Sequence, residues 1–500
     1  MKIKNSYFEF ACVALGSLFY VFGILLISGT ITSGYHLADD HEIVLLTQRF
    51  NEGLYDWKVL FRKGIFDYFA EGIRFRPFYE SIRFLRVFLF GTNYVAWSIW
   101  VALESVFSIV LAYYVSRNLG GDKLVSFLIG ILIISGEQSE IWWRLGPQEP
   151  TGLLLCLLCL FLIQIYEISG KKRICIPVIL SAFLMAATKE SFTIILPAIG
   201  LFGVGYDLFI TQFDNLWMGL KKTFRKNLLI FLSFSIIFIV NLYIIMFRVG
   251  LMSIGYAGLD VELGISGYLS LIVDILCSRG MRVFVIILIV SLFLYIIGDK
   301  KKLPKGKKRA IYIIAFSFLF IIGIELVLYA KSGMRGRYFV PFVIGVYFIS
   351  ITLISSIISS KKIRCVHTAI IMLCLVYALK VVWINACSFT EQGKVLNNGL
   401  SELDEYVDKE SVVLTCIDRS EYDYSISIYG KIELGLKNIY ALNVDNQICS
   451  LYKENEQIIN DVTDADYLIL SHDTDMVEHI DLTKYTICID LGYGYVYQKN

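Results

Sequence analysis

The chain has 500 residues, of which 56% are apolar and only 18% are charged, and its mean hydropathy is +0.64. An average soluble domain carries roughly 25% charged residues, so this composition excludes an ordinary soluble protein and predicts one embedded in lipid. Residues 389–500 hold 8 Lys and Arg against 21 Asp and Glu, a charge of −13, which leaves +15 on residues 1–388. An acidic segment is not attracted to nucleic acid, so we expect no nucleic-acid partner.

Apolar segments predict about eleven transmembrane helices. The first follows Lys2 and Lys4 and is an apolar run of 22 residues, which is long enough to cross a hydrocarbon core about 30 Å thick and too long for a cleaved signal peptide. Two later segments, the third and the fifth, fall below the roughly 17 residues of a span and require shielding by other helices. The eleven segments are Phe8–Gly29, Tyr94–Ser116, Leu124–Ser135, Thr151–Ile168, Ile174–Ala187, Ser191–Ile210, Asn227–Phe247, Arg282–Ile297, Ala310–Ala330, Tyr338–Ser359 and Val366–Ala386.

Basic residues in the short loops predict the orientation in the membrane. With a cytoplasmic N-terminus and eleven helices, every short basic cluster falls on the cytoplasmic side, as the positive-inside rule requires. The C-terminal residues then lie outside. We therefore expect a multi-pass cell-membrane protein with a transmembrane domain at 1–388 and an acidic extracytoplasmic domain at 389–500. The cytoplasmic clusters are Arg117 with Lys123, Lys171–Arg173, Lys221–Lys226, Lys300–Arg309 and Lys361–Arg364.

Two predicted extracytoplasmic regions are large. The first, at 30–93, contains Pro77–Phe90, in which apolar side chains recur at helical spacing opposite one Glu and two Arg, a pattern typical of an amphipathic helix in the membrane interface. The second, at 389–500, alternates strand-like and helix-like runs, which predicts a small α/β fold. Its predicted strands are Ser411–Ile417, Tyr467–Ser471 and Thr486–Leu491.

Carboxylates gather on the predicted outer face. Asp39 and Asp40 follow the first helix, in YHLADDHEI, and Glu149 opens the fourth helix, in RLGPQEP. A solvated loop and a complement to a helix dipole are the plain interpretations of these acids. The functional alternatives are that Asp39 or Asp40 is a general base, or that this pair holds a divalent cation, Mg²⁺ or Mn²⁺, through oxygen ligands. Asp40 and Glu149 are the candidate metal ligands.

Basic residues on the same face are candidate ligands for a substrate phosphate. Arginine suits bidentate phosphate binding, and ionisable residues at a membrane edge can bind the charged group of a ligand. The alternative is that these side chains snorkel to lipid head groups. The candidates are Arg74, Arg76, Arg144, Lys189, Arg335, Arg337 and the adjoining Tyr338.

Four segments in a fixed order carry a family resemblance. YHLADDHEI, RLGPQEP, TKESFTIILPAI and RGRYFVPF, within residues 1–360 and followed by a small α/β tail, resemble the GT-C superfamily of membrane glycosyltransferases. The similarity is to its protein O-mannosyltransferase and aminoarabinose transferase branches and to bacterial cell-surface glucosyltransferases. Glu149 departs from the pattern, because several relatives have Asp there. The resemblance implies a GT-C fold, Asp39 or Asp40 acting on the acceptor, Glu149 as a second acid, and Lys189, Arg335 or Arg337 holding a lipid phosphate.

The leading hypothesis is an enzyme that transfers a sugar from a polyprenyl-phosphate donor to a glycan, lipid or protein acceptor outside the cell. An acceptor hydroxyl needs a carboxylate to take its proton, and a departing phosphate needs positive charge beside it. A transporter or flippase of lipid-linked sugars is the alternative, but it would place charges near the bilayer midplane rather than at the outer edge. A polysaccharide polymerase would share the arginines but leaves Asp39 and Asp40 unexplained.

Overall fold

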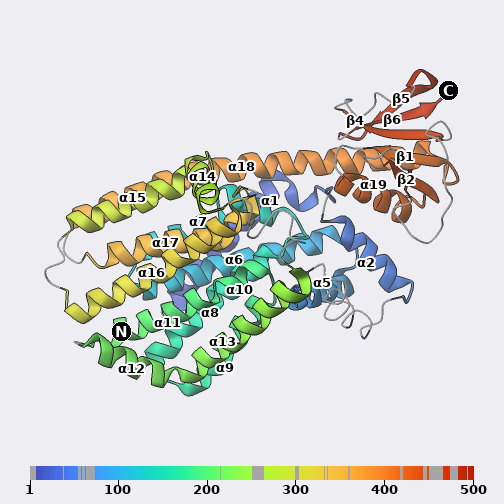
Figure 1. Cartoon of the computed structure of the whole chain (residues 1–500). Coiled ribbons are helices and arrows are strands. Elements are labelled where there is room, and N and C mark those ends of the chain that lie inside the picture. Colours follow the sequence, from blue (N-terminus) through green and yellow to red (C-terminus); the bar gives the residue numbers. More distant parts are fainter. Residues whose placement is uncertain are drawn as a thin grey trace.

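The computed structural model of the chain shows a long helical bundle with a small domain containing a β-sheet at one end (Figure 1). The N-terminus lies at the opposite end of the bundle from this domain. The structure describes residues 7–500 except 38, 55–57, 59–61, 63–73, 214, 251–263, 299–302, 332, 335, 358–360, 417–419, 443–447, 450–464, 473–481 and 493.

Within the described residues, eight helices are long and apolar enough to span a membrane, and a ninth span results if the bent pair α14 and α15 counts as one. The expectation of eleven is therefore too high, although the class of polytopic helical membrane protein is confirmed. The eight are α1 (Tyr7–Ser28), α6 (Tyr94–Asn118), α8 (Glu149–Ser169), α10 with α11 (Glu190–Ile194, Leu196–Thr211), α13 (Leu228–Tyr243) with the π-helical turn after it, α16 (Lys305–Leu328), the 3-10 turn η8 (Gly336–Phe339) with α17 (Val340–Ser355), and α18 (Lys361–Tyr406).

The difference in number comes from the two short apolar segments. They form α7 (Lys123–Ile134) and α9 (Cys175–Ala186), which have 12 residues each. At 1.5 Å per residue each is about 18 Å long, too short to cross about 30 Å of hydrocarbon alone. The bent pair, α14 (Gly264–Cys277) and α15 (Arg282–Ile297), meets at 91°. The fold is completed by α12 (Leu216–Lys226) at the end of the bundle that faces away from the sheet.

The core of the bundle is centred on α17, in which every side chain from Val340 to Ile354 is buried. This helix packs against α16, α15, α7 and α8. In contrast, only 22% of the spanning part of α1 and of α13 is buried, and both present apolar side chains to the outside. Such exposure is unfavourable in water but matches a lipid environment, so these helices form the lipid-facing sides of the bundle.

The amphipathic helix predicted in the first loop is present with the expected bounds, as α5 (Pro77–Phe90). Its charged side faces the protein: Arg83 pairs with Glu80 at 2.6 Å and also contacts Glu42, and all but Glu42 are buried. The exposed residues of α5 are apolar. A helix whose ion pairs point inward and whose apolar side points outward fits the interface of a membrane.

The C-terminal domain is a six-stranded mixed sheet in the order β3-β2-β1-β4-β6-β5, covered by α19 (Ser420–Ile432). β1 is parallel to β2 and β4, and the other neighbouring pairs are antiparallel. The expectation of a small α/β fold is confirmed. The strands are β1 (Val412–Cys416), β2 (Asn438–Leu442), β3 (Ile448–Cys449), β4 (Tyr467–Ser471), β5 (Tyr485–Asp490) and β6 (Gly494–Lys499). The proposed boundary at 388/389 lies inside α18, a continuous helix of 46 residues.

The first loop and the C-terminal domain share a hydrophobic cluster. Apolar side chains of α2 (His41–Asn51) pack against α18, α19 and the sheet. At the edge of this cluster, Nδ1 of His41 lies 2.8 Å from the hydroxyl of Ser425. Burial lowers the pKa of His41 to about 4, so the ring is neutral at pH 7 and can share a hydrogen bond with this hydroxyl. These contacts place the first loop and the C-terminal domain at the same end of the bundle (Figure 1).

The orientation of that end in the membrane is the first testable prediction. Because the basic residues of α12 and of the start of α16 lie at the end of the bundle away from the sheet, we expect reporter fusions to place 400–500 outside the cell and the basic segment Lys300–Arg309 in the cytoplasm. Alkaline phosphatase is a reporter that is active outside the cytoplasm. Its activity, when it is fused after each segment, measures the compartment of that segment directly. If both fusions reported the same compartment, the assignment of the polar end to the outer face would be wrong.

Candidate functional site

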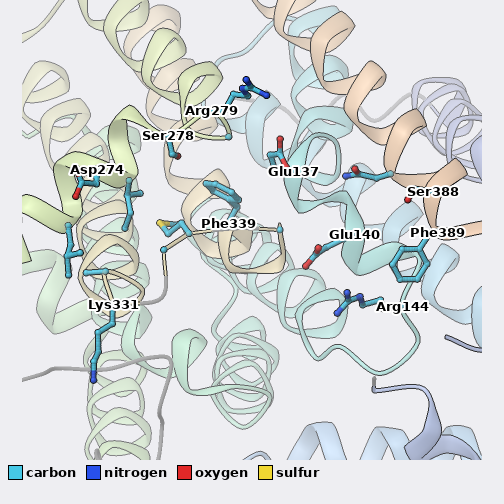
Figure 2. Close-up of a pocket in the computed structure, with 18 of the residues that line it drawn as sticks. Glu137, Glu140, Arg144, Asp274, Ser278, Arg279, Lys331, Phe339, Ser388 and Phe389 are labelled. Atoms are coloured by element: carbon cyan, nitrogen blue, oxygen red, sulfur yellow. The ribbon is translucent and has the colours of Figure 1, made fainter. Parts of the chain in front are cut away.

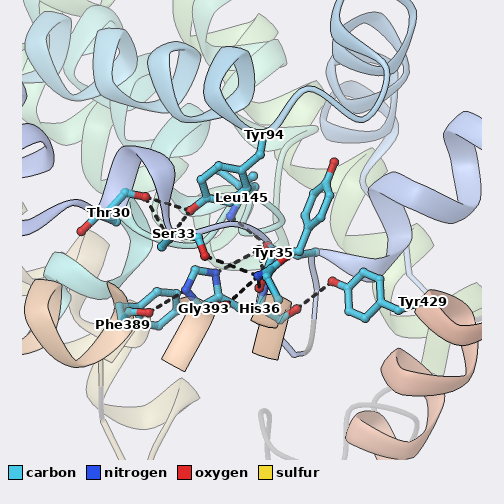
Figure 3. Close-up of polar contacts among 11 residues, drawn as sticks. Thr30, Ser33, Tyr35, His36, Tyr94, Leu145, Phe389, Gly393 and Tyr429 are labelled. Carbon is cyan, nitrogen blue, oxygen red and sulfur yellow. Dashed lines mark hydrogen bonds and ion pairs between the residues drawn. The ribbon is translucent and has the colours of Figure 1, made fainter. Parts of the chain in front are cut away.

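The turn before α2 gives two adjacent carboxylates different environments. Asp40 is fully buried. Its Oδ1 accepts a hydrogen bond from the backbone N–H of Leu145 at 3.1 Å, and its Oδ2 accepts one from the backbone N–H of His36 at 3.2 Å. The ring of His36 in turn lies 2.8 Å from the carbonyl oxygen of Phe389 on α18 (Figure 3). Asp40 thus joins the first loop to the segment before α8, which favours a structural role.

Asp39 is the more accessible of the two acids, with 25% of its side chain exposed. Its φ of 60° is left-handed, a conformation that Asp tolerates better than most residues, and it turns the side chain away from that of Asp40. A Cβ on Gly146 would lie 2.5 Å from the Cβ of Asp39, so only glycine permits this approach. Oδ2 of Asp39 accepts a hydrogen bond from Nη1 of Arg337 at 2.9 Å.

The short turn η8 holds Arg337 in place from the other side. The backbone N–H of Arg337 donates to Oε1 of Glu140 at 2.9 Å. The preceding Gly336 has φ 48°, and a Cβ there would lie 2.2 Å from the carboxyl group of Glu140. Glycine is therefore needed next to Arg337 both for the backbone conformation and for the close carboxylate.

A buried ion pair lies beside this turn. Nζ of Lys189 is 2.5 Å from Oε1 of Glu149, and both side chains are at least 95% buried. The ammonium group also lies 5.2 Å from the ring centre of Tyr338 and 5.7 Å from that of Tyr329, and these two rings stack on each other. A desolvated ammonium beside a carboxylate and two aromatic faces is fixed in position more firmly than one in water.

These contacts form one continuous set of polar groups. Arg337 connects its two ends, because its guanidinium binds Asp39 and lies 5.7 Å from the ring centre of Tyr338, which adjoins Lys189. Lys189 and Arg337 thus both lie beside the ring of Tyr338, and each is paired with one carboxylate, that of Glu149 or that of Asp39. Such a set can take a proton at an accessible carboxylate and stabilise negative charge at the cations. We call Asp39, Arg337, Tyr338, Lys189 and Glu149 the polar cluster.

The structure places Arg74 and Arg76 outside the polar cluster. The guanidinium of Arg76 donates to both carboxylate oxygens of Glu190, at 2.8 to 3.2 Å, and Nη1 of Arg74 lies 3.9 Å from the same carboxylate. The backbone N–H of Phe78 bonds to the carbonyl of Ala187 at 3.0 Å next to these pairs. Their arrangement favours a structural role, which is to fix the start of α5 to the start of α10.

The remaining phosphate-ligand candidates have different positions. Arg144 lies 5.6 Å from the ring centre of Phe389 and lines a cavity of about 810 Å³ beside η8. Tyr338 belongs to the polar cluster. Arg335 lies outside the described residues.

The proposed pair of metal ligands, Asp40 and Glu149, does not fit a shared cation in this arrangement. Both oxygens of Asp40 already accept backbone hydrogen bonds, and the ammonium of Lys189 beside Glu149 would repel a divalent cation. In the described part of the chain, no three His, Cys, Asp or Glu side chains form a group that could hold a metal ion.

Sequence reasoning did not single out Tyr329, Glu190 or Glu325. Tyr329 covers Lys189, Glu190 neutralises two arginines, and Glu325 is fully buried on α16 near the Lys189–Glu149 pair. Glu190 adjoins Lys189 in the TKESF segment, and Glu325 is a lone acid in an apolar span, so both carried a detectable signal. Tyr329 resembles the other aromatic residues at helix ends, so the sequence carried no signal for it.

The bundle, with its polar end and its small terminal domain, has the fold of GT-C membrane glycosyltransferases, which confirms the resemblance at the level of the fold. ArnT from Cupriavidus metallidurans, whose crystal structure was solved bound to undecaprenyl phosphate, is 11% identical to this chain. It aligns over 99% of this chain and 98% of its own with a TM-score of 0.53.

A second solved structure is similar to a lesser degree. The oligosaccharyltransferase of Archaeoglobus fulgidus, solved in complex with Zn and sulfate, is 13% identical over 92% of this chain and 68% of its own, with a TM-score of 0.48. No family model and no curated protein matches the chain by sequence.

Proposed function

We propose that this protein is a membrane glycosyltransferase that moves a sugar from a polyprenyl-phosphate donor to an acceptor outside the cell. The observation that carries the proposal is the polar cluster, in which the accessible carboxylate of Asp39 is held 2.9 Å from Arg337 and, through Tyr338, next to the buried cation of Lys189. A transferase of this kind needs a base beside the attacking hydroxyl and a cation beside the leaving phosphate, so the two groups must lie close together.

The cations supply the phosphate site. When the bond between the sugar and the phosphate breaks, negative charge grows on the leaving phosphate oxygen, and Lys189 and Arg337 are fixed where they stabilise it. Their positions are set by carboxylates and aromatic rings before substrate arrives, so little reorganisation is needed. The undecaprenyl phosphate bound to ArnT, which has the same fold, supports a polyprenyl phosphate as the donor's lipid. Nearby, α13 packs on α10 and presents apolar side chains that suit a prenyl chain.

Asp39 supplies the base. An acceptor hydroxyl loses its proton to the Asp39 carboxylate as its oxygen bonds to the anomeric carbon of the sugar. At the same time the bond from that carbon to the phosphate oxygen breaks, and polyprenyl phosphate leaves with the electron pair. Asp40 and Gly146 act on this step only through the loop, because they hold the backbone of Asp39 in place.

The direct test measures release of polyprenyl phosphate. Purified protein in lipid nanodiscs is incubated with a panel of polyprenyl-phosphate sugars and a cell-envelope extract as the source of acceptor. We expect one donor to be consumed with release of polyprenyl phosphate, and we expect the rate to be unchanged by EDTA because the acids of the site are paired with N–H groups and cations. Movement of intact donor across the bilayer without its cleavage would instead indicate a flippase. Loss of cleavage in EDTA, restored by Mg²⁺, would contradict the metal-free mechanism.

A further inference from the structure

A large polar cavity adjoins the polar cluster but shares none of its side chains. Its volume is about 810 Å³, and it lies between α14, α18, η8 and the short 3-10 helix η3 (Glu137–Trp142) (Figure 2). Its walls carry three carboxylates, three cations, two amides, two serine hydroxyls and two phenylalanine rings. The side chains that matter here are Glu137, Glu140, Asn385, Gln392, Ser388 and Phe389.

A single turn of chain, η8, separates the cavity from Arg337 and Asp39. Gly336 and Phe339 of η8 form part of its wall, whereas Arg337, between them, turns its side chain to Asp39. Glu140 belongs to both regions, because it lines the cavity and accepts the backbone N–H of Arg337. Lys189, Arg337 and Tyr338 do not line the cavity, so the cavity is separate from the two cations of the polar cluster.

The chemistry of the walls selects one class of ligand. Three carboxylates and three cations line the cavity, so its charges balance and it favours an uncharged polar ligand over a strongly charged one (Figure 2). They are Glu137, Glu140 and Asp274, and Arg144, Arg279 and Lys331. A lipid chain would need a mainly apolar wall, but more than half of the lining residues are charged, amide or hydroxyl-bearing. The hydroxyl groups of a sugar donate well to carboxylate and amide oxygens and accept from guanidinium and amide N–H groups. A volume of this size lies in the range of pockets that enclose a whole small ligand.

We propose that this cavity is the acceptor site and that the acceptor is the end of an uncharged glycan, whose terminal hydroxyl lies next to Asp39. This inference rests on the proposed function and deepens it, because it selects one of the three acceptor classes, glycan, lipid and protein. Glu137 and Gln392 bind the hydroxyls of the glycan.

The test separates donor use from acceptor use. Protein in nanodiscs receives a radiolabelled polyprenyl-phosphate sugar together with the glycan, lipid or protein fraction of a cell-envelope extract. We expect label in the uncharged glycan fraction. The variant E137A should raise the glycan concentration for half-maximal rate by about tenfold to a hundredfold, the effect of losing a hydrogen bond to a charged group, and Q392A by about two- to tenfold. Neither should change the concentration of donor required.

Two controls keep the outcomes apart. Glu391 is an exposed acid next to Gln392 on α18 that does not line the cavity, so E391A should behave as the unmodified protein. Gln392 is itself exposed, so Q392A remains informative if E137A fails to fold. Label in the lipid or protein fraction, or a change in donor requirement alone, would overturn the acceptor site while leaving the glycosyltransferase intact. Absence of donor cleavage with every fraction would overturn the proposed function itself.

Discussion

Replacing Asp39 by Asn is expected to lower the rate of sugar transfer by about 10²–10⁴-fold while leaving the protein folded and inserted. The amide keeps the size of the side chain but cannot accept the proton of the acceptor hydroxyl, and general-base catalysis contributes about this factor. A quarter of the Asp39 side chain is exposed, and its partner Arg337 is exposed to a similar extent, so the loss of their ion pair should cost only about 1 kcal/mol of stability. Initial rates of polyprenyl phosphate release measure the effect.

The neighbouring Asp40 provides the matched control. Asp40 is buried and accepts two backbone hydrogen bonds, so D40N replaces one acceptor oxygen by a donor that faces an N–H group. That mismatch costs about 1–3 kcal/mol. We therefore expect D40N to lower the thermal unfolding temperature and D39N to lower the rate. The reverse pattern, with a stable but inactive D40N and an active D39N, would assign the base to Asp40.

Removing the cation of Lys189 should reduce transfer by about 10²–10³-fold, the usual cost of losing one oriented group that stabilises developing charge. The variant K189M keeps the length of the side chain but leaves the carboxylate of Glu149 buried and unpaired, which by itself costs about 3–5 kcal/mol. The double variant K189M/E149Q removes both charges and should recover most of this stability. It should not recover activity, because the phosphate would still lack its cation.

Three measurements complete this test. Arg337→Gln should lower the rate by a similar factor, because its guanidinium adjoins both Asp39 and Tyr338. Lys394 is an exposed cation on α18 at the same end of the bundle, and K394M should leave the rate unchanged. Thermal unfolding of each variant separates folding from catalysis. Full activity of the folded double variant would remove Lys189 from the phosphate site and return it to a purely structural pair with Glu149.

The sequence alone was sufficient for most elements of the fold. Apolar length located the long helices of the bundle, the spacing of apolar residues and the Pro at its start predicted α5 with its bounds, and alternating patterns found β1, β4 and β5. It did not predict α2, α12 or α14, nor the strands β2, β3 and β6. The predicted elements depend on residues close together in the chain, where periodicity and length carry the information. The number of spans was overestimated for the same reason, because hydropathy does not show that α7 and α9 are short helices sheltered by their neighbours.

The distinction between the two adjacent acids came only from the tertiary structure. Asp39 and Asp40 have the same chemistry and follow each other in the chain, but the left-handed backbone at Asp39 sends their side chains to different partners, Arg337 and the N–H groups of His36 and Leu145. Arg337 is nearly 300 residues away, so no local pattern records the contact.

The same reason applies to the cations. The sequence determined that the candidate phosphate ligands would lie at the outer end of the bundle, because the lipid-embedded helices leave only their ends for charge. It did not determine which of these cations would be neutralised by a carboxylate in a structural ion pair. Arg76 lies against Glu190, 114 residues away, whereas Lys189 and Arg337 meet around Tyr338. Packing of distant helix ends decides that division, since it brings together groups that are separated by whole transmembrane spans.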